Sequence, residues 1–160
     1  MLSLFASIFL FLSCVVARPV EEATAASSYQ IRGVSSPIFH LYLQALPSSA
    51  STPVLGPAAS GEYFTIGSTI QSTNTSNYLN IGTASTSYKP LSFSKTSNTT
   101  AWALEGDTII TATASTYGRQ LNFVACQLTG GYYSIYLQTG SDVPSGTCSN
   151  FQTLHLPCLC

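Results

Sequence analysis

The residues best placed to do chemistry in this chain are the cysteines near its carboxyl end: Cys126, Cys148, Cys158 and Cys160. An even set in a secreted protein predicts two disulfides. Cysteines separated by a single residue rarely bridge, so a Cys158–Cys160 bond is not expected. We therefore expect Cys126 and Cys148 each to pair with one of the last two cysteines, in either order. No metal is expected, because the usual C-x2-C spacing of a zinc site is missing.

Acidic and imidazole side chains, which could supply acid–base catalysis, are few. In the predicted domain they are Glu62, Glu105, Asp107, Asp142, His40 and His155. Glu105 and Asp107 flank Gly106 in a predicted hairpin turn, which favours solvated turn formers over the carboxylate pair of a glycosidase. The histidines lack a nucleophile-elbow motif such as GxSxG. The sequence favours a non-enzymatic protein without catalytic residues or a cofactor.

Tyrosine and asparagine residues suggest contact with carbohydrate. Tyr42, Tyr132 and Tyr136 are expected on outward faces beside Ser, Thr, Asn and Gln, a surface that can stack on sugar rings. Ordinary cross-strand aromatic pairing is the alternative for these rings. Two sequons, at Asn74 and Asn98, lie in polar turns and predict N-glycosylation. The alternative is an unmodified asparagine that stabilises its turn.

Strands must position these residues, because the chain is rich in β-branched and aromatic residues and lacks a 3.6-residue period. A short strand is expected to begin at Tyr29. Ile38–Leu46 alternates and predicts a half-buried strand, with Phe39, Leu41 and Leu43 on one face. Pro47–Ser60 contains three prolines and a glycine and predicts a surface loop.

A repeat spans the middle of the chain, with Tyr63–Ser94 matching Ala101–Tyr136 at an offset of about 40 residues. Each copy reads aromatic–x–aliphatic, a glycine-containing turn, Thr-Ile, a polar turn, Leu-Asn and a further strand. Trp102 fits a core position in this pattern. A third copy would have to come from the two ends of the chain. The predicted fold is all-β: a compact antiparallel barrel, β-trefoil-like, with a disulfide-stapled carboxyl end, or alternatively a β-sandwich.

The amino-terminal segment and the charge balance predict the compartment. Residues 1–17 form an apolar run ending in small residues, as in a signal peptide. Residues 18–28 are expected to be a flexible mature amino terminus, and residues 29–160 a single all-β domain. Charged residues make up 7% of the chain and the net charge is −1. This balance indicates neither a nucleic-acid partner nor a membrane partner after signal cleavage.

The closing part of the chain resembles the fungal phialide cell-wall protein (PhiA) family of small secreted proteins. The resemblance lies in a signal peptide, an early FHLYLQAL strand, Leu121-x-Phe123-x-Ala125-Cys126, the strand Tyr133–Tyr136, a Gly/Pro-containing loop to Cys148, Phe151 and Pro157-Cys158. The Cys160 end and the absence of a cysteine between the leader and Cys126 depart from it. The resemblance implies a protein connected with fungal wall structure and development, with no catalytic residues to carry over.

Together these features predict a secreted, glycosylated, non-enzymatic structural protein of the fungal cell wall or extracellular matrix. Wall polysaccharide or other wall proteins are its expected partners. The alternatives are a lectin-like carbohydrate-binding module or a secreted effector, motivated by the tyrosines. A weaker alternative is a protease inhibitor that presents Pro47–Ser60 as a rigid loop.

Overall fold

The computed structural model of the protein describes residues 27–157. The predicted signal peptide, most of the predicted flexible amino terminus, Cys158 and Cys160 lie outside the described residues. The elements are β1 (Arg32–Gly33), β2 (Tyr42–Leu46), β3 (Ser49–Gly56), η1 (Ala58–Ser60), β4 (Phe64–Ile66), β5 (Ile70–Ser72), β6 (Tyr78–Ile81), β7 (Tyr88–Ser94), β8 (Trp102–Glu105), β9 (Thr108–Thr111), β10 (Phe123–Gln127), η2 (Thr129–Gly131), β11 (Tyr133–Gln138), β12 (Cys148–Gln152) and β13 (Leu154–His155).

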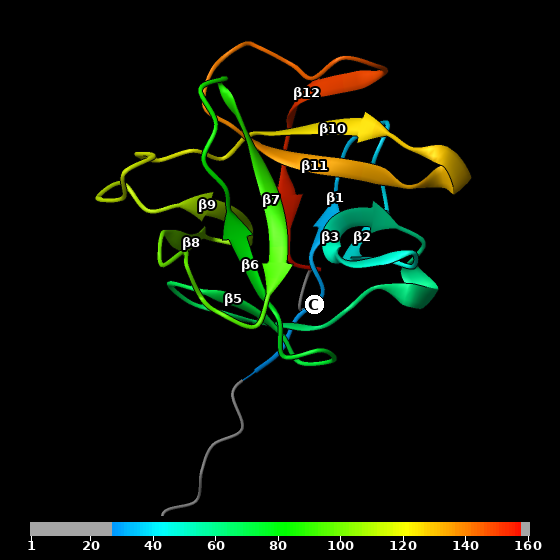
Figure 1. Ribbon diagram of the computed structural model, residues 1–160. Helices are drawn as coiled ribbons and strands as arrows, with labels where there is room; N and C mark the ends of the chain where they lie inside the picture. Colours follow the sequence, from blue (N-terminus) through cyan, green and yellow to red (C-terminus); the bar gives the residue numbers. More distant parts are fainter. Residues whose placement is uncertain (1–26, 158–160) are drawn as a thin grey trace, which may run out of the picture.

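The strands form one antiparallel sheet that curls into a nearly closed barrel (Figure 1). The order of neighbouring strands is β4-β5-β6-β7-β11-β3-β2-β1-β13-β9-β8. Outside this order, β10 pairs with both β11 and β12. The two ends of this order meet, since β4 contacts β8. There the backbone N–H of Trp102 donates to the Ser68 carbonyl at 3.1 Å. The predicted all-β antiparallel barrel is confirmed.

The internal repeat appears in the strand pairing. The first copy supplies the β4–β5 hairpin and the β6–β7 pair, and the second supplies β8–β9 and β10–β11. The ends of the chain supply comparable pairs, because β13 lies antiparallel to β1 and β2 pairs with β3. Figure 1 shows β1 beside the carboxyl-terminal strand in the middle of the molecule. The two ends of the chain thus supply the remaining strand pairs of the barrel.

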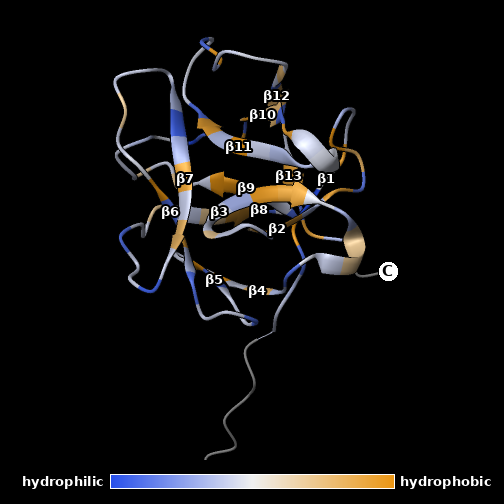
Figure 2. Ribbon diagram, turned by 45° about the vertical axis from the view of Figure 1, so that its right-hand side comes forward, coloured by the Kyte–Doolittle hydropathy of each residue, from blue (hydrophilic) through white to orange (hydrophobic). Residues whose placement is uncertain are grey.

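Inward-facing aromatic and aliphatic side chains of the strands fill the barrel. Trp102 is 2% exposed, and its ring stacks on Phe123 with centroids 6.5 Å apart. The indole N–H donates to the Leu79 carbonyl at 2.9 Å, which satisfies the polar atom of this buried ring. Figure 2 shows hydrophobic positions on strands such as β9, while many turns are hydrophilic. Trp102 therefore occupies the core position predicted for it.

The predicted strand Ile38–Leu46 is wrong in its first half, because only Tyr42–Leu46 is extended. The preceding residues form a tight turn in which His40 has a φ of 59° and its backbone N–H donates to β1. This turn buries Ile38 completely and leaves Phe39 58% exposed. The inward and outward faces expected from simple alternation are therefore reversed here.

The predicted surface loop Pro47–Ser60 is also wrong, since it contains the strand β3 and the short helix η1. β3 lies between β2 and β11, where Val54 and Leu55 are fully buried. Pro53 faces Ala45 beside a register shift in the β2–β3 ladder, a place where a residue without an N–H is tolerated. Burial of two aliphatic side chains outweighs the turn preference of the prolines. The rigid-loop basis for a protease inhibitor is therefore absent.

Candidate functional site

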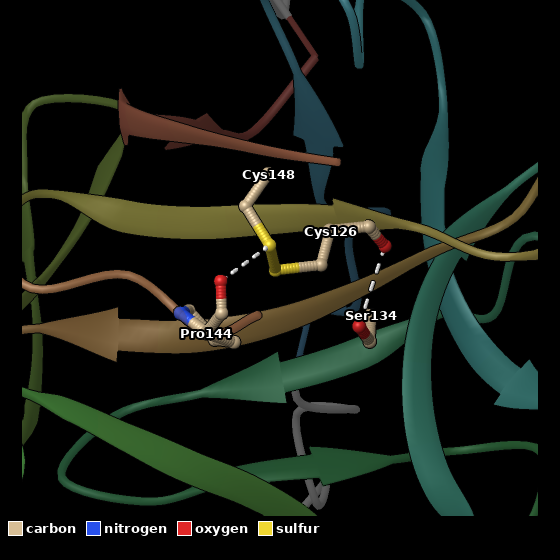
Figure 3. The surroundings of a disulfide bond; sticks show 4 residues. All are labelled: Cys126, Ser134, Pro144 and Cys148. Atoms are coloured by element: carbon tan, nitrogen blue, oxygen red, sulfur yellow. Dashed lines mark hydrogen bonds between the residues drawn. A yellow bond between two sulfur atoms is a disulfide. The ribbon is translucent and has the colours of Figure 1, made fainter. Parts of the chain in front are cut away.

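Cys126 on β10 and Cys148 on β12 form a disulfide (Figure 3). The two residues face each other in the β10–β12 register, with Cα atoms 4.0 Å apart. The Cys126 carbonyl accepts a hydrogen bond from the Ser134 hydroxyl at 3.3 Å. The Cys148 Sγ atom lies 3.5 Å from the Pro144 carbonyl oxygen, which is a contact only, because a half-cystine carries no S–H proton. The bond thus joins two strands that are already hydrogen-bonded neighbours.

This bond corrects the predicted connectivity, in which Cys126 and Cys148 each paired with Cys158 or Cys160. The predicted pairings followed from excluding a Cys158–Cys160 bond, whereas Cys148–Gln152 is the strand β12, which lies beside β10 and places Cys148 opposite Cys126. A cross-strand position brings the two sulfur atoms together without further rearrangement. The predicted staple near the carboxyl end is present, with a different partner.

Both predicted glycosylation sequons lie at the surface. Asn74 is exposed in the turn between β5 and β6, and its side-chain oxygen accepts the Tyr63 backbone N–H at 3.0 Å. Asn98 is exposed in the link between β7 and β8. The hydroxyl residues two positions later, Ser76 and Thr100, are exposed as well. The peptide segments that a glycosyl transferase must reach are therefore accessible at both sites.

A buried asparagine that sequence reasoning missed holds the Asn98 sequon in place. Asn80 is 4% exposed, and its side-chain oxygen accepts the backbone N–H groups of Asn98 at 2.7 Å and Thr99 at 3.0 Å. Its amide nitrogen donates to the Thr96 carbonyl at 3.0 Å. The Thr99 hydroxyl in turn accepts the Ile81 N–H at 2.8 Å. The Leu-Asn step of the internal repeat was the available signal, since Asn80 occupies it.

Beside this sequon lies a hollow of about 410 Å³, here called the Asn98 hollow. Residues 98–101 of the β7–β8 link form one wall, and residues 112 and 114–117 of the β9–β10 link form the other. Its lining consists of small alanine and hydroxyl side chains and one aromatic ring, Tyr117. Sequence reasoning did not find this site, because its two walls come from links that are neighbours only in the folded chain.

The structure places the three candidate sugar-binding tyrosines in different surroundings. Tyr132 lines a second hollow of about 300 Å³ with residues 46–48, 128 and 129, here called the Tyr132 hollow. Tyr136 makes an edge-to-face contact with Tyr88, with ring centroids 5.6 Å apart. Tyr42 lies on β2 opposite Gly56. Each tyrosine is half-buried, and among the residues described no ring stacking joins the three.

The acidic residues at the predicted hairpin turn have separate partners. Gly106, at φ 62°, allows the tight β8–β9 turn. Glu105 forms a two-point ion pair with Arg119, in which Nε donates to Oε2 at 2.7 Å. This hydrogen bond, with the opposite charge, holds the pKa of the Glu105 carboxyl below its usual range. The expected turn is present, and Glu105 is paired within it.

A hydroxyl–imidazole–carboxylate chain connects β13 to the same turn. His155 Nδ1 lies 3.2 Å from the Asp107 carboxylate, and its Nε2 lies 3.0 Å from the Thr153 hydroxyl. Neither the Asn98 hollow nor the Tyr132 hollow is lined by these residues. His40, the other imidazole, stacks on Phe39 at a centroid distance of 3.9 Å. The chain of hydrogen bonds ties the last described strand to the β8–β9 hairpin.

Glu62 is a buried carboxylate that accepts hydrogen bonds from two strands, β2 and β5. It is 8% exposed, accepts the backbone N–H of Ala45 at 2.8 Å, and accepts a hydrogen bond from the Ser72 hydroxyl. Both oxygens therefore have donors, as a buried carboxylate requires. Asp142 makes a comparable surface link, because its backbone N–H donates to the Ser87 hydroxyl at 2.8 Å.

Within residues 27–157, no three His, Cys, Asp or Glu side chains are grouped closely enough to hold a metal ion. The same part of the chain contains no helix with the length and apolar character needed to cross a membrane. No family model, curated protein or solved structure matches the chain.

Proposed function

We propose that this chain is a secreted, glycosylated, non-enzymatic protein that contributes to the structure of a fungal cell wall or extracellular matrix. The observation that carries the proposal is the Cys126–Cys148 bond between neighbouring strands. Disulfides persist in oxidising compartments such as the secretory pathway and the cell exterior. The apolar segment at residues 1–17 supports the same route.

The surface chemistry supports a role in a carbohydrate-rich matrix. Asn74 and Asn98 are exposed within sequons, and the turns around them are rich in serine and threonine. Such neutral hydroxyl and amide groups hydrogen-bond to sugar hydroxyls without needing a charged partner. The layout of the closing part of the chain, including Cys126 and Cys148, resembles the phialide cell-wall protein family and supports a wall location.

Fractionation of a fungus that expresses the chain with its leader tests this proposal. We expect the protein in the culture medium and the wall fraction, with its mass reduced by treatment with a peptide N-glycosidase. An Asn74→Gln/Asn98→Gln variant provides the control, since the enzyme should leave its mass unchanged. Recovery from the cytosol alone, with unmodified asparagines and a free Cys126 thiol, would contradict the proposal.

A second candidate function, binding of wall glycans, is favoured by the Tyr132 hollow. The Tyr132 ring lies against Gly56, so that a side chain at position 56 would collide with it. Apolar atoms dominate the rest of the hollow, with Leu46 and Leu128 among the lining. An aromatic ring fixed in an apolar depression suits stacking on the face of a sugar.

Retention on chitin, β-glucan and mannan resins tests this second function. We expect Tyr132→Ala to weaken retention on one of the resins about tenfold, the loss that accompanies removal of an aromatic contact of about 1.4 kcal/mol. Tyr63→Ala is the matched control, because Tyr63 is 48% exposed and lies outside both hollows. Equal retention of the two variants would exclude the Tyr132 hollow as the binding site.

A further inference from the structure

The walls of the Asn98 hollow are held in a fixed arrangement without any ligand. The Ala112 backbone N–H donates to the Ala101 carbonyl at 2.7 Å, which joins the two links across the base of the hollow. The Thr111 hydroxyl donates to the Gly118 carbonyl at 2.6 Å and accepts the Gln120 backbone N–H at 3.0 Å, and the Gln120 side-chain amide donates to the Tyr117 carbonyl at 2.9 Å. A depression that is already ordered binds a ligand at a lower entropic cost.

Tyr117 supplies the aromatic wall, and its position is set by the core. The ring is half-buried and packs against the hydrophobic core, so that only part of it faces the hollow. Ala101 and Ala112 are half-buried beside it, while Thr100 and Thr116 are exposed at the rim. The depression therefore combines half-buried alanine and tyrosine side chains with hydroxyl groups, the combination that complements a sugar ring carrying a methyl group.

Asn98 projects from the rim of this depression on a rigid support. Its backbone N–H and that of Thr99 are both bound by the buried Asn80 side chain, while the Asn98 side chain is exposed. Asn74 differs in both respects, because its side-chain oxygen is engaged by the Tyr63 N–H and it lines neither hollow. The two sequons thus offer a matched pair, one beside a preformed depression and one without it.

We propose that the Asn98 hollow is the seat of the first N-acetylglucosamine units of the glycan attached to Asn98. The acetamido methyl group and one sugar face pack on Ala101, Ala112 and Tyr117, and the sugar hydroxyls reach Thr100 and Thr116. At about 410 Å³ the hollow falls at the small end of ligand sites, which span about 300–1,000 Å³. Covalent attachment gives the sugar a local concentration in the millimolar range or above, so that a weak contact is enough to fill the hollow.

This inference rests on the glycosylation that forms part of the proposed function, and its consequence is local. The docked sugar would join the β7–β8 link to the β9–β10 link and protect both from opening. A glycan at Asn74 would remain in solvent. The proposal therefore predicts that the two glycans make unequal contributions to stability.

A cycle of variants, produced by a fungal secretory host, tests the docking. The variants are Asn98→Gln, Ala114→Gln, their combination, and Asn74→Gln as the control. Ala114 is exposed and lines the hollow, so a longer side chain there obstructs the hollow without disturbing the core. We expect Asn98→Gln to lower the melting temperature by about 2–4 °C in the wild-type background and to have no effect in the Ala114→Gln background. Asn74→Gln should leave the melting temperature unchanged.

Titration with free chitobiose, followed by NMR of the protein amides, separates the docked glycan from an external ligand. We expect shifts at residues 112–117 in the Asn98→Gln variant and none in the glycosylated wild type, whose hollow is filled. Equal shifts in both proteins would overturn the inference in favour of an external sugar. If Asn98 carries a glycan but Asn98→Gln lowers the melting temperature equally in the wild-type and Ala114→Gln backgrounds, the docking alone is overturned. An unmodified Asn98 in the secreted protein would overturn the docking together with this part of the proposed function.

Discussion

Replacement of both half-cystines, Cys126→Ala with Cys148→Ala, measures how much the disulfide contributes to the free energy of unfolding. The bond closes a loop with a sequence separation of 22 residues. The chain-entropy relation for such a loop gives about 3 kcal/mol, which comes mainly from restriction of the unfolded chain. For a domain of this size, a loss of about 3 kcal/mol lowers the melting temperature by about 10 °C. The β10–β12 ladder should remain, because its backbone hydrogen bonds do not depend on the sulfur atoms.

The single tryptophan provides the assay. Trp102 is 2% exposed, so its fluorescence reports the opening of the barrel during urea unfolding. The comparison should be made in a Cys158→Ala/Cys160→Ala background, which removes any exchange with the two cysteines outside the described residues. In that background, a reductant should lower the stability of the protein with Cys126 and Cys148 to that of the double variant. The double variant itself should not respond to the reductant.

Two results would refute this reasoning. A stability change below about 1 kcal/mol would show that the bond does not restrict the unfolded chain as the entropy relation requires. Peptide mapping tests the pairing itself and needs chymotrypsin, because no lysine or arginine follows Arg119. Phe, Tyr and Leu residues separate all four cysteines, and we expect a linked peptide pair that contains Cys126 and Cys148. A peptide joining Cys126 to Cys158 or Cys160 would contradict the structure.

Three further substitutions test the core and the surface. Trp102→Phe removes the indole donor to the buried Leu79 carbonyl, and we expect urea unfolding followed by circular dichroism to show a loss of about 1–3 kcal/mol; an unchanged midpoint would contradict this. Asn80→Ala leaves two backbone N–H groups of the β7–β8 link without an acceptor, and we expect a loss of at least about 2 kcal/mol with faster amide exchange in that link; exchange as slow as in the wild type would argue against the role of Asn80. Arg119→Gln removes the donor that lowers the Glu105 pKa, so an NMR titration should show that pKa rising toward the ordinary glutamate value. Because the folded-state pKa is depressed, the pair stabilises the fold above the unfolded-state pKa and ceases to do so as the pH falls through the folded-state pKa. Wild type and Arg119→Gln should therefore converge in stability in acid, and a constant difference would contradict the assignment.

Features that depend on short stretches of sequence were predicted well. The hairpin turn at Gly106, the core position of Trp102 and the surface position of the Asn74 and Asn98 sequons all follow from local patterns. The internal repeat adds a longer pattern, and its two copies supply the pairs β4–β5 and β6–β7, and the pairs β8–β9 and β10–β11. Residue alternation and turn preferences involve only a few neighbouring residues, so they can be recognised in a single sequence.

Failures occurred where a distant strand determines the local structure. Pro47–Ser60 has the composition of a loop, yet β3 forms there because β2 and β11 flank it and bury Val54 and Leu55. The turn before β2 is set in a similar way, since a backbone hydrogen bond to β1 fixes His40 at a positive φ. Long-range pairing in both cases overrides a local preference, which is the usual limit of propensity arguments for strands.

The sequence by itself determined that this is an all-β chain built around a repeat, with cysteines near its carboxyl end and sequons in its turns. Tertiary structure alone decided that Cys126 pairs with Cys148 and that Asn98 stands beside a hollow. The physical reason is the same for both. A disulfide partner and a depression depend on which strands and links become neighbours when the barrel closes, and that neighbourhood is set by contacts between residues far apart in the chain.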